Sequence, residues 1–149
     1  MGQGVEELSV YQRARELTNR VYQVTRVGTF VRDYSLVDQV RRASLSVMCN
    51  IADGFERGTN DEFLDFLLVA KGSCGQVLAQ VSVAFDQKYI SKTDYGDLTD
   101  RCRRISGMLG NLIHHLKRSQ LSGRKIERPS PKSTTEELNE ITENKKREE

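Results

Sequence analysis

The chain has 149 residues, of which 37% are apolar and 30% are charged, so it is long enough to bury the core of one soluble domain. No stretch of about 18 uncharged apolar residues predicts a membrane span, and the acidic segment from Met1 to Leu8 lacks the apolar region of a signal peptide. We therefore expect a cytoplasmic protein with no membrane contact, whose net charge of +2 does not by itself indicate a polyanion partner.

Four segments carry apolar residues at the alternating three- and four-residue spacing of an amphipathic helix. They run from about Glu7 to Arg26, from Asp33 to Arg57, from Thr59 to Ala84 and from Ser91 to Leu116. The last two begin with a hydroxyl side chain that is followed three positions later by an acid, which predicts helix N-termini. The sustained period of 3.5 residues and the short connections predict an all-α, up-down-up-down, left-handed four-helix bundle over residues 1–119.

The helical pattern ends before the C-terminus. Residues 120–133 contain two prolines and several basic and serine residues, which predict a linker. Residues 134–149 are almost entirely polar, and only Leu138 and Ile141 could anchor a helix there. We expect a flexible charged tail over residues 120–149 that is disordered or forms a frayed helix.

Basic residues gather within and beside the predicted helices. Residues 1–119 hold 16 Lys or Arg against 14 Asp or Glu. A guanidinium group pairs with phosphate through a planar fork, so a cluster on one face would bind nucleic acid. The alternative is a solvated face with local ion pairs, such as Arg104 with Asp100. The candidate nucleic-acid-binding residues are Arg41, Arg42, Arg57, Arg101, Arg103, Arg104, Lys117 and Arg118.

The second and third predicted helices carry more apolar residues than one core-facing stripe requires. The additional residues are Leu36, Val37, Leu45, Met48, Phe55, Phe66, Leu68, Val69, Leu78 and Phe85. A second apolar band predicts a subunit interface, and hence self-association. The alternative is a wider stripe of the kind that ordinary globular helices turn towards their core.

Residues that could support catalysis or metal binding are few. The cysteines Cys49, Cys74 and Cys102 are widely spaced, and the histidines His114 and His115 have no third ligand or paired nucleophile nearby. We expect buried, reduced thiols, no metal and no cofactor. The nucleophile-elbow, phosphate-loop and HExxH motifs are missing from the sequence, so we expect no enzymatic activity.

Several stretches carry a family resemblance. QVRRASLSVMCNIADGFERG (39–58), NDEFLDFLLVAKGS (60–73), KYISKTDYGDL (88–98) and ELSVYQRARELTNRVYQVT (7–25) resemble the helical proteins first noted in intervening sequences of bacterial 23S rRNA genes. The most specific part is the second-helix motif, an arginine pair followed by an Asn-Ile-Ala-acid-Gly-Phe run. The residues that match it are Arg41, Arg42, Asn50, Asp53, Gly54 and Phe55. From its place near the apolar seam, Asn50 could hydrogen-bond across helices and fix their register.

The resemblance implies a four-helix bundle that forms a ring-shaped homopentamer without enzymatic activity. The related accessory variability proteins of diversity-generating retroelements bind RNA and a reverse transcriptase. The chain departs from the family pattern at Met48 (usually proline), Asp53 (usually glutamate), Asp65 (usually basic) and Gln76 (usually glutamate), and Asp65 removes one expected positive charge.

Together these observations predict a homo-oligomeric accessory protein that binds RNA or another nucleic acid, in the context of a retroelement or of an rRNA gene. The alternative is a protein–protein interaction module without direct nucleic-acid binding.

Overall fold

The computed structural model describes residues 4–121 and 131–143, and within them every regular element is helical. The helices, in chain order, are η1 (Val5–Glu7), α1 (Ser9–Thr25), η2 (Phe30–Arg32), α2 (Tyr34–Glu56), α3 (Asn60–Asp86), α4 (Lys92–Leu121) and α5 (Pro131–Glu143), where η denotes a short 3-10 helix.

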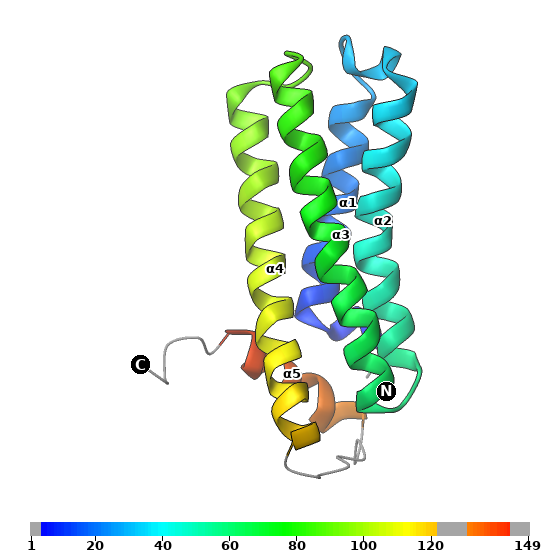
Figure 1. The fold of residues 1–149 in the computed structure, drawn as a ribbon, viewed down its shortest axis with the longest axis vertical. Coiled ribbons are helices and arrows are strands. Elements are labelled where there is room, and N and C mark those ends of the chain that lie inside the picture. The colour runs from blue at the N-terminus through cyan, green and yellow to red at the C-terminus, as the bar shows by residue number, and fades with distance from the viewer. Residues whose placement is uncertain (1–3, 122–130, 144–149) are drawn as a thin grey trace.

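The four long helices α1 to α4 lie side by side and alternate in direction (Figure 1). α2 packs against α1 and α3, and α4 packs against α3 and closes the ring by contacting α1. This arrangement confirms the predicted all-α bundle with up-down-up-down topology. Short connections favour it, because they leave consecutive helices no option but to run antiparallel to each other.

The core lies along the axis of the bundle and is built from the predicted stripes. Leu17, Ile51, Leu67 and Leu109, one from each long helix, have no exposed surface. Burying an aliphatic side chain of this size contributes about 1.5–3 kcal/mol, so the four seams together supply the main driving force for folding.

Side-chain caps fix where the helices begin. Thr59 Oγ1 accepts a hydrogen bond from the Glu62 amide at 3.3 Å, and Ser91 Oγ accepts one from the Asp94 amide at 3.0 Å. Both predicted N-termini are therefore confirmed. Asp33 caps α2 in the same way, through a 3.1 Å bond from the Leu36 amide.

α3 ends in a turn that puts a lysine in the left-handed region. The Tyr89 amide donates to the Ala84 carbonyl and the Lys88 amide to the Phe85 carbonyl, both at 2.9 Å. This pair of bonds is the Schellman motif, which requires a left-handed residue after the helix. Lys88, with φ of 62°, occupies the position that glycine usually fills.

α3 carries large apolar side chains outside the core, on a side of the helix that also holds the exposed Asp65 and Gln76. Leu68, Val69 and Val83 are 43%, 53% and 47% exposed, and Gly72 and Ala79 lie between them along the same side of the helix. By length and composition α3 could cross a membrane, although a third of its most apolar 18-residue window is buried inside the bundle. Of the helices within residues 4–121 and 131–143, it alone has this property.

The structure differs from the sequence-based expectation at the C-terminus. Residues 131–143, expected to be disordered or frayed, form α5, which lies across the end of the bundle next to the start of α1 (Figure 1). Leu138 is buried and Ile141 packs partly buried against the core. The two expected anchors are therefore enough to hold the helix, because the end of the bundle offers them an apolar surface. The rest of the expected tail, residues 122–130 and 144–149, lies outside the described residues.

The outer side of α5 is acidic. The side chains that it turns to solvent include Glu136, Glu137, Glu140 and Glu143.

Candidate nucleic-acid interface

Two of the predicted nucleic-acid-binding arginines are neutralised locally. Arg42 Nε lies 3.0 Å from Asp38 Oδ2, and Arg57 Nε lies 2.9 Å from Asp53 Oδ1. Each pair joins residues four apart on α2, which is the local pairing that the sequence left open as the alternative. A phosphate at either guanidinium would have to compete with a carboxylate that is already in place.

Arg101 belongs to an ion-pair network between α1 and α4. Its guanidinium lies 3.1 Å from Asp97 and 3.5 Å from Glu16, and Asp97 also accepts a hydrogen bond from Arg20 Nε at 3.1 Å. The network joins the first and fourth helices of the bundle. Arg101 therefore contributes polar contacts between α1 and α4, and its predicted role in nucleic-acid binding stays a prediction.

Four of the five remaining predicted residues lie on the outer side of α4. Arg103, Arg104, Lys117 and Arg118 are exposed. The possible pairing of Arg104 with Asp100 is not among the ion pairs of the described residues. These four residues form a basic surface on α4 that does not adjoin Arg41 on α2, and their role in nucleic-acid binding stays a prediction.

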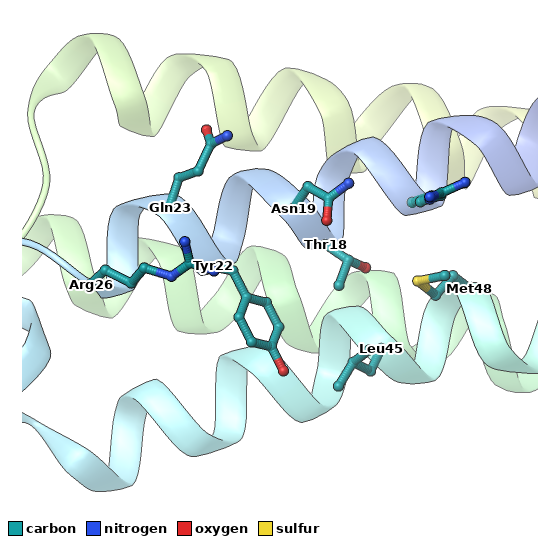
Figure 2. A pocket seen from close by; sticks show the side chains of 8 residues that line it. Thr18, Asn19, Tyr22, Gln23, Arg26, Leu45 and Met48 are labelled. Carbon is teal, nitrogen blue, oxygen red and sulfur yellow. The ribbon is translucent and has the colours of Figure 1, made fainter.

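The structure reveals a basic groove between α1 and α2. It is open to solvent and has a volume of about 510 Å³. Figure 2 shows Tyr22 projecting from α1 towards α2, with Leu45 and Met48 on α2 forming the apolar part of the lining. The residues that line this α1/α2 groove are Arg15, Thr18, Asn19, Tyr22, Gln23, Arg26, Leu45 and Met48.

Arg41 is held at the edge of the groove by two neighbours on α1. Its Nε donates to Thr25 Oγ1 at 2.9 Å, and its guanidinium carbon lies 4.5 Å from the centre of the Tyr22 ring. Thr25 is itself buried, and its hydroxyl donates to the Val21 carbonyl at 2.8 Å. Because only Nε is used, the two terminal amino groups of Arg41 keep the geometry that pairs with two oxygens of one phosphate.

None of the described residues that line the groove carries a carboxylate. Among the described residues, no ion pair involves Arg15, Arg26 or Arg41, whereas Arg13, Arg20, Arg42, Arg57 and Arg101 all have acidic partners. Uncompensated guanidinium groups around an amide- and aromatic-lined groove attract anions, and they have donors with which to bind phosphate.

The α1 side of this groove was not predicted from the sequence. Arg15, Asn19, Tyr22 and Arg26 are spaced by four, three and four residues, so they form one polar stripe along α1. That spacing was available as a signal. The spacing alone did not identify a binding surface, because the sequence does not show which stripes of α1 have acids facing them from α2 or α4.

The second-helix motif turns out to organise the α2–α3 contact. Asn50 Nδ2 donates to the Ser46 carbonyl at 2.7 Å and to Ser46 Oγ at 3.0 Å, and Ser46 Oγ lies 2.8 Å from Ser73 Oγ on α3. Asn50 thus bonds within its own helix and reaches α3 only through Ser46. The predicted link across helices exists, but its direct members are the two serines.

Gly54 and Phe55 of the motif are buried between α2 and α3. The Phe55 ring meets Phe63 edge to face, with centroids 6.2 Å apart. This is a favourable geometry for aromatic pairs, so this half of the motif serves packing.

The cysteines fall into two environments. Cys74 and Cys102 are buried, as predicted, and burial raises the pKa of both thiols to about 12. Cys49 is exposed, contrary to the prediction. It is two positions away from the buried Val47, which puts it on the opposite side of α2. The described residues include no group of three or more His, Cys, Asp or Glu that could hold a metal ion.

Comparison with known proteins gives a family and a fold. A model of the 23S rRNA-intervening sequence protein family matches residues 6–111. A crystal structure of a protein of unknown function from the S23 ribosomal protein family, from Bacteroides thetaiotaomicron, is 16% identical and has a TM-score of 0.63, with 76% of this chain and 98% of that chain covered. No curated protein matches the chain. Since the family model covers more than half of its residues, the chain belongs to the 23S rRNA-intervening sequence protein family.

Proposed function

We propose that this protein is a non-enzymatic, homo-oligomeric accessory factor that binds RNA through phosphate contacts in the α1/α2 groove. The family name associates such proteins with RNA genes. The observation that carries the proposal is a set of three arginines without an acidic partner among the described residues: Arg15 and Arg26 line the groove, and Arg41 lies over Tyr22 at its edge.

The groove favours the nucleic-acid backbone over base sequence. Arg41 offers a fork that matches phosphate, and the Tyr22 ring under its guanidinium holds that fork at the edge of the groove. Three phosphate contacts to a single strand give a logarithmic salt slope of about −2 per subunit, so binding should weaken steeply with salt. A ring of subunits would repeat the groove and multiply this effect.

The exposed face of α3 supports self-association. Leu68, Val69 and Val83 would leave water when a second copy covers them. Beside this face, Gln80 Oε1 is buried and has no hydrogen-bond partner within residues 4–121 and 131–143. A donor from a second subunit would satisfy it. We propose a pentamer, as in the family pattern, and a cytoplasmic protein whose α3 face meets protein rather than lipid.

The RNA test compares two triple variants with the same change in charge. The groove variant replaces Arg15, Arg26 and Arg41 with glutamine. The control replaces three ion-paired arginines, Arg13, Arg42 and Arg57, with glutamine. Binding of a short, fluorescein-labelled single-stranded RNA is followed by anisotropy at several salt concentrations.

The groove variant should bind on the order of 1,000-fold more weakly or worse, since each of the three lost charged hydrogen bonds contributes about 1.5 kcal/mol or more. The control should retain most of its affinity. Equal loss in both variants would mean that net charge alone drives binding. Full binding by the groove variant would show that RNA binds to another surface. Arg103 and Arg104 of α4 would then be the first residues to test.

The second candidate function is a protein–protein interaction module, and the apolar face of α3 favours it. A reverse transcriptase is the partner that the resemblance to retroelement accessory proteins suggests. If the unaltered protein ignores RNA even at low salt, the RNA proposal fails and this candidate replaces it.

A further inference from the structure

The start of α1 lacks a cap from its own neighbourhood. The N-cap position is held by Leu8, whose aliphatic side chain is completely buried and can accept no hydrogen bond. The first amides of any helix have no partner within the helix, and side chains or water must satisfy them. The sequence before α1 therefore leaves Ser9 in need of an acceptor.

α5 brings that acceptor from the other end of the chain. Asn139 Oδ1 accepts a hydrogen bond from the Ser9 amide at 2.8 Å, and Asn139 Nδ2 donates to the Glu7 carbonyl at 3.2 Å. The two groups of one side-chain amide thus bridge the junction between η1 and α1. The two bonds join residues that are 130 and 132 positions apart in a chain of 149 residues.

A side chain of α4 satisfies a backbone carbonyl near the C-terminal end of α5. The Thr142 carbonyl lies in the last turn of α5, where the helix itself supplies no amide, and it accepts from Asn111 Nδ2 at 3.2 Å. Thr142 Oγ1 also lies 3.3 Å from Ser9 Oγ. α5 therefore links α1 to α4 through polar contacts at both helices.

We propose that α5 is a clasp that completes the N-terminus of α1 by supplying, through Asn139, the cap that its own sequence lacks. Leu138 anchors α5 on the end of the bundle, and Asn139 on the docked helix caps the N-terminus of α1. The clasp lies outside residues 6–111, the part that matches the family model. The inference is independent of RNA binding and of self-association.

The test uses the full-length protein and residue-resolved amide hydrogen exchange. Asn139→Ala removes both bonds, and Asn139→Asp keeps the acceptor for the Ser9 amide. Glu140→Ala is the matched control, because Glu140 is the next residue and is exposed. Protection is read at the first turn of α1 and, for comparison, in the middle of α3.

In Asn139→Ala, protection at the start of α1 should fall about fivefold, the equivalent of the roughly 1 kcal/mol that an N-cap contributes, while α3 stays unchanged. Asn139→Asp should keep most of that protection, since a carboxylate also favours a helix N-terminus. Glu140→Ala should match the unaltered protein. The proposal is overturned if α1 keeps its protection in Asn139→Ala, or if all helices lose protection equally.

Discussion

At the scale of single residues, Gly54 determines how closely α2 approaches α3. A β-carbon built on Gly54 would lie 2.6 Å from the β-carbon of Phe66 and 3.3 Å from Cδ1 of Phe63. Contacts this short between carbon atoms do not persist in packed proteins, so any larger residue must push the two helices apart. Glycine is therefore required at this position of the second-helix motif for α2 to approach α3 this closely.

Replacing Gly54 with alanine should destabilise the protein by up to about 2 kcal/mol, because an overpacking cost of about 1–3 kcal/mol exceeds the gain of about 1 kcal/mol in helix propensity. Gly107→Ala is the control. A β-carbon at Gly107 of α4 meets no atom within 4 Å, so this change should stabilise by about 0.5–1 kcal/mol. Urea unfolding followed by circular dichroism measures both, and a stabilised Gly54→Ala would contradict the packing argument.

The role of a residue was predictable where it follows from a repeated sequence pattern. It was not predictable where it depends on a neighbour from another helix. The core stripe and the caps at Thr59 and Ser91 follow from local spacing and are confirmed. The partners of Arg41 and Arg101 depend on which side of α1 faces them. Sequence spacing carries no information about that pairing, so the ion pairs of Arg101 were not predicted, and its role in nucleic-acid binding stays a prediction.

At the scale of elements, the turn between α3 and α4 stores strain at Lys88. A side chain with a β-carbon in the left-handed region costs about 1 kcal/mol relative to glycine. The hydrogen bonds of the Schellman motif and the stacking of Phe30 on Tyr89, with centroids 5.2 Å apart, hold the chain in this conformation.

Lys88→Gly should therefore stabilise the protein by roughly 0.5–1 kcal/mol, as seen in thermal unfolding. Gln87→Gly provides the comparison one position earlier. Gln87 has φ of −78°, a conformation open to any residue, so glycine there brings only extra unfolded-state entropy and should destabilise. Stabilisation by both variants would indicate that flexibility of the turn, and not the left-handed conformation, is the relevant property.

The elements of the bundle were predictable because each long helix carries its own periodic stripe. α5 was not, because 13 residues with two apolar anchors cannot form a stable helix alone. Its stability comes from Leu138 on the end of the bundle and from bonds to Ser9 and Asn111. A sequence window around residue 138 contains none of those partners.

At the scale of the whole molecule, the exposed face of α3 should govern assembly. We expect an oligomer in light scattering coupled to size-exclusion chromatography, and we expect Val69→Lys together with Val83→Lys to give single subunits, because two buried ammonium groups would face apolar surface. Val27→Lys is the control, since Val27 is 62% exposed but lies in the turn after α1. A monomeric unaltered protein would refute the self-association proposal.

The acidic outer side of α5 gives the particle a polarity. Its four glutamates gather at one pole, whereas the arginines of the groove lie along the flank between α1 and α2. Fixed negative charge repels a phosphodiester chain over about 8–10 Å at moderate ionic strength. A strand held along the flank would thus be repelled from the pole that carries α5 and would extend more readily past the opposite one.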